Sequence, residues 1–184
     1  VYESGVTFFL EGPPASGYTT GGDVNRCAHF AGGRMRARLH SLGERYTVVL
    51  SFWNGMPSDA RETTGWLFSR DYADSISGHG DHLGIGGTST QPGRLIFQHG
   101  HSVPLVATTA LERWTWNRVM LVRDGKRVRV YLNDIAKPVI DAAVDPSTSA
   151  ESCFVGGRSD NDSNFEGRID EVAVFDRALT PQDL

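Results

Sequence analysis

The clearest structural signal in this chain is the stretch NFEGRIDEVAVFDRALTPQDL, residues 164–184. Its middle, residues 168–175, is rich in β-branched and aromatic side chains, which favour a β-strand. Thr180 followed by Pro181 is typical of a helix start, and Asp183 adds an acidic residue close behind. We therefore predict a last strand over residues 168–175 that leads into a short helical turn. One face of this strand should carry Arg168 and Asp170, and the other Ile169, Glu171, Ala173 and Phe175.

Strand-like patterns continue through the rest of the chain. Further strands are predicted at residues 46–53, 95–97, 117–122, 127–132 and 153–155. Residues 46–53 are apolar at both odd and even positions, which indicates a central strand covered on both faces. Asp124-Gly125 lies between two of the runs and is a strong hairpin signal. Residues 70–93 form the longest weakly patterned stretch, which we expect to be a loop.

Composition excludes several classes of protein. The 184 residues are 39% hydrophobic and 22% charged, which is ordinary for one globular domain. The net charge of -4 argues against a nucleic-acid partner, which would call for a basic surface. No apolar run is long enough to span a bilayer, so we expect no membrane insertion. The chain opens at Val1 without a signal peptide, and we expect a domain cut from a longer protein.

The C-terminal stretch closely resembles the ending of laminin G-like domains, which typically close with F-x-G-x-I-D-E-V-x-I-Y-x-R-A-L-S. Three further segments agree in order with that family. Residues 46–53 resemble its F-T-V-S-F-W strand, residues 116–125 its W-H-H-V…D-G hairpin, and residues 131–134 its Y-V-D-G. The resemblance implies an all-β fold, a two-sheet antiparallel jelly-roll β-sandwich of the concanavalin A-like type, as a single domain over residues 1–184.

The resemblance also shapes the expected function. The related laminarinase-type glucanases carry E-x-D-x-x-E on one strand, and the chain lacks this pattern. It also lacks the Gly-x-Ser-x-Gly, H-E-x-x-H and phosphate-loop motifs. We expect a non-catalytic recognition domain of an extracellular or cell-surface protein, whose ligand is a glycan or an extracellular protein. Two alternatives remain: a structural spacer without its own ligand, and a glycan-active hydrolase or lyase on the same fold.

Calcium is the cofactor that the resemblance implies. Jelly rolls of this superfamily often hold one structural Ca²⁺ near the last strand, through an aspartate and backbone carbonyls. Asp170 matches that aspartate, and Asp23, beside two glycines, would supply a second carboxylate. The alternative is that Asp170 pairs with a neighbouring arginine or caps a turn. Residues 160–164 are a second acidic and amide-rich candidate, although such clusters are usually plain turns.

Aromatic, cysteine and basic residues complete the candidates. Trp66, Tyr72 and Trp114 fall outside the predicted core strands, so their rings would stack on a sugar or pack at the rim. Cys27 and Cys153 form an even pair that permits a disulfide, or they are two buried thiols that never meet. The histidines at positions 79, 82, 99 and 101 are interpreted as solvated loop residues rather than zinc ligands. Arginines 34, 36 and 38 alternate and should line one strand face, either solvated or gripping an anion.

Overall fold

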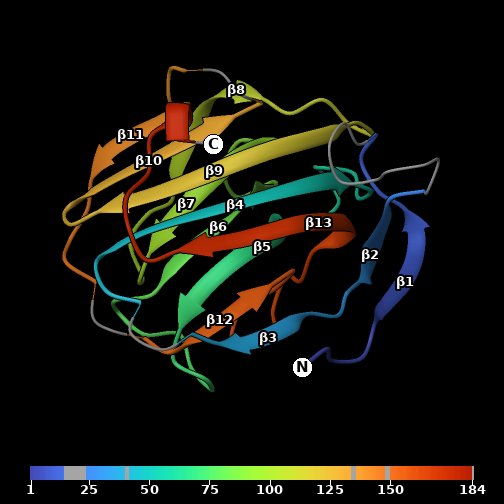
Figure 1. Ribbon diagram of the computed structural model, residues 1–184, viewed down its shortest axis with the longest axis horizontal. Coiled ribbons are helices and arrows are strands. Elements are labelled where there is room, and N and C mark those ends of the chain that lie inside the picture. Colours follow the sequence, from blue (N-terminus) through green and yellow to red (C-terminus); the bar gives the residue numbers. More distant parts are fainter. Residues whose placement is uncertain (15–23, 40–41, 134–135, 148–149, 184) are drawn as a thin grey trace.

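The computed structural model describes residues 1–14, 24–39, 42–133, 136–147 and 150–183. It is a sandwich of two antiparallel sheets, which confirms the predicted fold (Figure 1). The seven-stranded sheet runs, in spatial order, β1 (Val6–Glu11), β2 (Arg26–Ala31), β13 (Glu166–Phe175), β4 (Arg45–Asn54), β9 (Trp116–Asp124), β10 (Arg127–Leu132) and β11 (Ile140–Ala143). The six-stranded sheet runs β3 (Met35–Arg38), β12 (Ser152–Val155), β5 (Thr63–Asp71), β6 (Asp81–Gly86), β7 (Arg94–His99) and β8 (Leu105–Ala110). No helix within the described ranges is long and apolar enough to cross a membrane.

The central strand β4 is covered on both faces, as predicted. Side chains from both sheets form one hydrophobic core between them. The residues of β4 that point into this core are Tyr46, Val48, Leu50 and Phe52. On its outer face, Val49 packs with Met120, Val122 and Leu179 in a second, smaller cluster. The C-terminal segment therefore closes over the outside of the seven-stranded sheet, because Leu179 lies within that cluster. The turn that follows is one 3-10 helix, Pro181–Asp183.

A β-bulge changes the predicted alternation of the last strand. The pairing of β13 with β4 shifts between Asp170 and Ala173, and Glu171 takes a φ of 53°. Beyond the bulge, Val174 packs against the main core, whereas Phe175 joins the outer cluster. The prediction that Ile169 and Phe175 share one face is therefore wrong, because the extra residue of the bulge reverses the side-chain period.

Strand β6 lies inside the stretch that we expected to be a loop. All six of its residues are buried. Leu83 and Ile85 enter the core, but the alternate positions hold His82 and glycines, which hide the strand pattern in the sequence. Gly84 is required there because a Cβ atom would lie 2.7 Å from the Trp66 ring. The weak pattern thus reflects a strand whose outer face is packed against other side chains.

Candidate functional site

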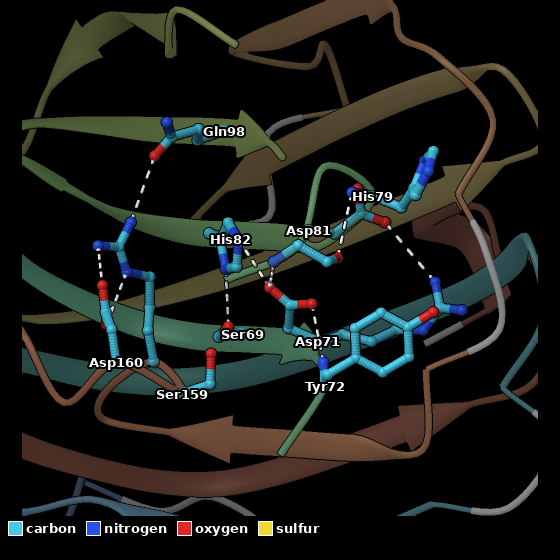
Figure 2. A network of polar contacts seen from close by, with 12 residues as sticks. Ser69, Asp71, Tyr72, His79, Asp81, His82, Gln98, Ser159 and Asp160 are labelled. Atoms are coloured by element: carbon cyan, nitrogen blue, oxygen red, sulfur yellow. Dashed lines mark hydrogen bonds and ion pairs between the residues drawn. The ribbon is translucent and has the colours of Figure 1, made fainter. Parts of the chain in front are cut away.

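A buried polar cluster covers part of the outer face of the six-stranded sheet, on the side away from the core (Figure 2). Ser69 on β5 and His82 on β6 are register partners, and the Ser69 Oγ lies 2.7 Å from the His82 Nδ1. The His82 Nε2 lies 3.6 Å from the Asp71 carboxylate. All three residues have no exposed surface. Burial and the positive charge of Arg158 lower the pKa of His82 to about 3, so its ring is neutral near pH 7.

An arginine lies over this cluster and forms part of the surface. The Arg158 guanidinium stacks 4.4 Å from the centre of the Trp66 ring. It donates a 2.6 Å hydrogen bond to Asp160 and a longer one, of 3.4 Å, to Gln98. Figure 2 shows Asp160 and Gln98 on either side of the guanidinium. The outcome is a polar surface of fixed geometry above a buried indole.

The loop that follows β5 borders this surface. Tyr72 comes directly after the strand, and its side chain is 48% exposed. Its backbone N–H donates to the Asp71 carboxylate at 2.8 Å. The hydroxyl of Ser159 donates to the carbonyl of Ser75 at 2.9 Å, which joins the two loops that flank the surface. The exposed Tyr72 ring thus lies beside Asp71 at one end of the cluster, and Asp160 and Gln98 lie toward the other end (Figure 2).

A second polar cluster lies on the inner side of β6, within the core. The Asp81 carboxylate accepts a 2.7 Å hydrogen bond from the Tyr46 hydroxyl and lies 2.8 Å from the His99 Nδ1. Arg123 and Arg70 approach it at 3.4 and 3.8 Å. Burial alone would raise the pKa of Asp81, but the hydrogen bonds and the Arg123 charge hold it below its usual value. This carboxylate is therefore ionised and compensated by buried cations.

The three aromatic candidates do not form one site. Trp66 is only 2% exposed, because Arg158 covers its ring. Tyr72 lies at the end of the sandwich where Tyr46 contacts Asp81. Trp114 is 62% exposed but precedes β9 at the opposite end, where Trp116 pairs with Trp53. Tyr72 and Trp114 therefore lie too far apart to bind one sugar ring.

Asp170 lies on the outer face of the seven-stranded sheet, beside the bulge. Its carboxylate accepts hydrogen bonds from the Asn25 amide at 3.0 Å and from the Glu171 N–H at 2.9 Å. Arg168 instead stacks on Trp53 and donates to the Glu11 carbonyl, so it is not the partner of Asp170. Asp23 lies outside the described residues. Among the described residues, no group of three or more His, Cys, Asp or Glu side chains is arranged to hold a metal.

The two cysteines are free and buried, so the permitted disulfide does not form. Cys153 belongs to the main core between the sheets. Cys27 lies on the other face of its sheet, because its neighbour Ala28 packs against the core and strand residues alternate. Its thiol donates to the Glu11 carbonyl at 3.2 Å. The seven-stranded sheet thus separates the two sulfur atoms.

Sequence reasoning missed the two buried histidines. His82 and His99 are 0% and 6% exposed, so their interpretation as solvated loop residues is wrong, whereas His79 and His101 are exposed. The signal that was available is their place next to core residues: His82 directly precedes Leu83, and His99 is two residues from Phe97, on the same strand face. Two of the three alternating arginines, Arg34 before β3 and Arg36 within it, are not fully solvated either. Arg34 pairs with Glu3 at 2.5 Å, and Arg34 and Arg36 both lie over the buried Phe154 ring.

Comparison with known proteins identifies the family to which this fold belongs. Residues 31–184 match the family model for the concanavalin A-like lectin/glucanases superfamily. No curated protein sequence matches the chain. Among solved structures, domain 4 of AbnA, a GH43 extracellular arabinanase from Geobacillus stearothermophilus in complex with arabinotriose, aligns with a TM-score of 0.65 at 20% identity, covering 96% of this chain and 84% of that one.

Two other structures show the same architecture. The CBM40 of the Ruminococcus gnavus IT-sialidase, bound to alpha2,3 sialyllactose, gives a TM-score of 0.59 at 18% identity, covering 77% of this chain and 81% of that one. A heptameric SAP-like pentraxin from Limulus polyphemus gives 0.61 at 17% identity, covering 97% and 79%. Identities this low establish a shared fold and leave the ligand to be argued from this chain's own residues.

Proposed function

The chain belongs to the concanavalin A-like lectin/glucanases superfamily, and we propose that it is a non-catalytic carbohydrate-recognition domain of an extracellular protein. The glycan would lie on the outer face of the six-stranded sheet, against Arg158, Asp160 and Gln98, and would extend past Asp71 toward Tyr72 (Figure 2). One observation carries this proposal: the Arg158 guanidinium is held between Asp160 and Gln98 above the Trp66 ring. Carbohydrate-binding proteins among the structural neighbours support it.

The chemistry of this surface suits a sugar. Guanidinium, carboxylate and amide groups together offer donors and acceptors to neighbouring hydroxyls. The side chains of Arg158 and Asp160 are only 13% and 30% exposed, so little conformational freedom is lost on binding. The exposed ring of Tyr72 adds an apolar face against which the C–H groups of a sugar would pack.

The geometry of Ser69, His82 and Asp71 supports a non-catalytic role. These are the residue types of a serine hydrolase triad. Here, however, all three have no exposed surface, so a substrate would not reach the Ser69 hydroxyl. The Ser69 hydroxyl also meets Nδ1, and the carboxylate lies near Nε2, the reverse of the triad arrangement. We infer that this cluster supports the surface above it.

A glycan array probed with the 184-residue chain tests the proposal. We expect binding to at least one glycan class, and Tyr72→Ala should weaken it about tenfold or more, because truncating an anchoring aromatic typically costs over 1 kcal/mol. Trp114→Ala is the matched control, since it removes an exposed aromatic at the opposite end of the sandwich. An empty array with calcium present, or binding lost in Trp114→Ala and retained in Tyr72→Ala, would contradict the proposed surface. Cleavage of a bound glycan would contradict the non-catalytic role.

We also propose a structural calcium ion at Asp170. The Asn25 Nδ2 donates to the Asp170 carboxylate, at 3.0 Å, and to the Pro13 carbonyl, at 3.3 Å, so these two oxygens already face one position. Asp170 forms no ion pair with any described residue. Calcium requires six to eight oxygen ligands. The Asp170 carboxylate and the Pro13 carbonyl would hold the ion, and the Asn25 amide would turn over to offer its oxygen in place of its nitrogen. The ion would tie the N-terminal segment to β13.

Chelation tests the calcium proposal. Removal of calcium should lower the Tm of the wild-type chain, because an ion that binds only the folded state stabilises it by mass action. Asp170→Ala should lower the Tm and abolish the effect of the chelator. Asp141→Ala, which removes an exposed carboxylate on β11, should keep that effect. A wild-type Tm that is the same with and without chelator, in protein shown by elemental analysis to be metal-free, would overturn the proposal.

A further inference from the structure

One end of the outer face of the seven-stranded sheet carries three of the four tryptophans of the chain. Trp53 on β4 and Trp116 on β9 are register partners, so their side chains leave the sheet on the same side. That side is the outer one, because the neighbouring Phe52 belongs to the core and strand residues alternate. Trp114 lies two residues before Trp116 and is 62% exposed. Figure 1 shows β13, β4 and β9 side by side across this sheet.

An arginine stacks on two of these rings. The Arg168 guanidinium lies 5.0 Å from the centre of the Trp53 ring, and that of Arg113 lies 4.7 Å from the centre of the Trp114 ring. Arg168 donates to the Glu11 carbonyl at 3.2 Å, and neither arginine forms an ion pair with a carboxylate of the described residues. A guanidinium carries five N–H donors in its plane, so stacking leaves its edge open to an oxyanion.

The backbone around these rings helps to fix their positions. A Cβ atom on Gly55 would lie 3.1 Å from the Trp53 ring, so this ring packs against the Gly55 backbone as well as against Arg168. Trp114 takes a φ of 58°, in the left-handed region that an aromatic residue rarely adopts. Such outliers persist only where the surrounding structure holds them, and they cluster at binding sites. Side chains that are already ordered lose little conformational freedom when a partner binds.

The chemistry of this surface favours carboxylates. Arginines lie over the rings of Trp53 and Trp114, so the surface presents guanidinium edges, which suit a carboxylate better than a neutral sugar. Tryptophan and arginine are also the residue types that contribute most to binding at protein interfaces. The net charge of -4 disfavours a densely charged polyanion such as a nucleic acid. A short protein segment with two or three carboxylates is repelled much less.

The dimensions of the surface suit an extended segment. Neighbouring strands lie about 4.8 Å apart, so the row from Arg168 across Trp53 to Trp116 spans about 10 Å. The two residues back to Trp114 add up to about 7 Å. An extended chain advances about 3.3 Å per residue, so about five residues would cross from Arg168 to Arg113.

We propose that this surface, the tryptophan face, binds an extended acidic segment of another protein. The tryptophan face consists of Trp53, Arg113, Trp114, Trp116 and Arg168. Aspartate or glutamate side chains of the segment would accept paired hydrogen bonds from Arg168 and Arg113, and the apolar groups between them would pack on the three indole rings. The inference does not rest on the proposed glycan surface, which lies on the other sheet.

Fluorescence anisotropy with the 184-residue chain tests the tryptophan face. The probe is a labelled peptide of about ten residues in which glutamate and proline alternate, because proline keeps the chain extended. We expect saturable binding at about 50 mM salt that weakens at about 500 mM salt, since salt screens the exposed charges. The same peptide with glutamine in place of glutamate should not bind.

Variants of the two arginines locate the binding. Arg168→Gln and Arg113→Gln should each weaken it about tenfold, because a charge-assisted hydrogen-bonded pair is lost. Arg168→Lys keeps the charge but loses the paired donors, and it should weaken binding about threefold. Arg127→Gln is the matched control, since it removes an arginine on β10 whose side chain is 54% exposed, and it should leave binding unchanged. If Arg168→Gln fails to fold, Arg113→Gln, at an exposed position, takes its place.

Two aromatic variants separate this surface from the glycan surface. Trp114→Ala should weaken peptide binding about tenfold and leave glycan binding intact, whereas Tyr72→Ala should do the reverse. The proposal is overturned if the glutamate peptide does not bind, if the glutamine peptide binds equally well, or if both arginine-to-glutamine variants bind like the wild type. Tighter binding of duplex DNA or of a sulfated oligosaccharide than of the acidic peptide would also overturn it.

Discussion

At the scale of single residues, Asp81 and His82 show how neighbours in sequence acquire opposite electrostatic environments. They lie on opposite sides of β6, since strand residues alternate. Asp81 faces Arg123 and His99, which keep it ionised. His82 faces Ser69 and the neutral Trp66 ring, 5.8 Å from its own ring centre, and burial keeps it neutral. Near neutral pH, Asp81 is therefore charged and His82 is neutral.

The lowered pKa of His82 predicts a loss of stability in acid. The unfolded chain takes up a proton near pH 6.5, whereas the folded chain does so only near pH 3. The contribution of the neutral His82 ring to the free energy of unfolding is therefore complete above about pH 6.5. It falls by up to about 1.4 kcal/mol per pH unit as the pH drops below that value. Urea unfolding of His82→Gln should show a flatter decline between about pH 7 and about pH 5 than the wild type.

His101→Gln is the control for this measurement, because His101 is exposed and should leave the slope unchanged. Titration of Asp81 does not affect the free energy of unfolding between about pH 7 and about pH 5. Its lowered pKa means that its contribution is lost only below the usual aspartate pKa of about 4. A His82→Gln variant with the wild-type slope would show that the buried imidazole is not the group that titrates.

The two thiols should be unreactive in the folded chain. Burial raises the pKa of Cys153 to about 12 and that of Cys27 above its usual value, so little thiolate forms near neutral pH. Titration with a thiol reagent, without reductant, should find slow or no reaction in buffer and two thiols after unfolding in urea. No free thiol in urea would instead show a disulfide.

At the scale of elements, close backbone contacts join the loops at the end of the sandwich near Asp81. The Gly100 N–H, at the end of β7, donates to the Gly80 carbonyl at 2.7 Å. A Cβ atom on Gly100 would lie 2.2 Å from the Gly78 carbonyl oxygen. The loops around β6 and β7 therefore pack backbone against backbone, which only glycine permits at this position.

Gly100→Ala and Gly125→Ala separate steric overlap from backbone strain. Both glycines have a positive φ, of 53° and 59°, but a Cβ on Gly125 would meet nothing within 4 Å. Gly125→Ala should lower the free energy of unfolding by about 1–2 kcal/mol, the cost of a left-handed alanine. Gly100→Ala should lower it by about 1–3 kcal/mol more, because the loops must also move apart. Equal losses in urea unfolding would mean that the contact with Gly78 relaxes at no cost.

At the scale of the whole molecule, one core joins the two sheets. Leu50 and Val119 of the seven-stranded sheet and Leu83 and Phe97 of the six-stranded sheet belong to the same buried cluster. If one sheet unfolded alone, the apolar side chains of the other sheet would be exposed to water. The two sheets are therefore expected to unfold together.

Equilibrium unfolding in urea tests this cooperativity. Far-ultraviolet circular dichroism reports on both sheets, whereas the fluorescence of Trp66, Trp53 and Trp116 reports on their outer faces. The two transitions should share one midpoint, as they do for a two-state domain. Separate midpoints would show that one sheet persists after the other has unfolded.

The sequence by itself determined the fold through the family resemblance of its closing stretch, and it determined the central strand at 46–53 and the hairpin at Asp124-Gly125 through local periodicity and turn chemistry. It did not reveal β6, where histidine, aspartate and glycine replace the apolar pattern. Nor did it show that Arg158 covers Trp66, since that contact joins residues far apart in the chain. Buried polar partners exist only when separate strands meet, and no spacing along one strand specifies them.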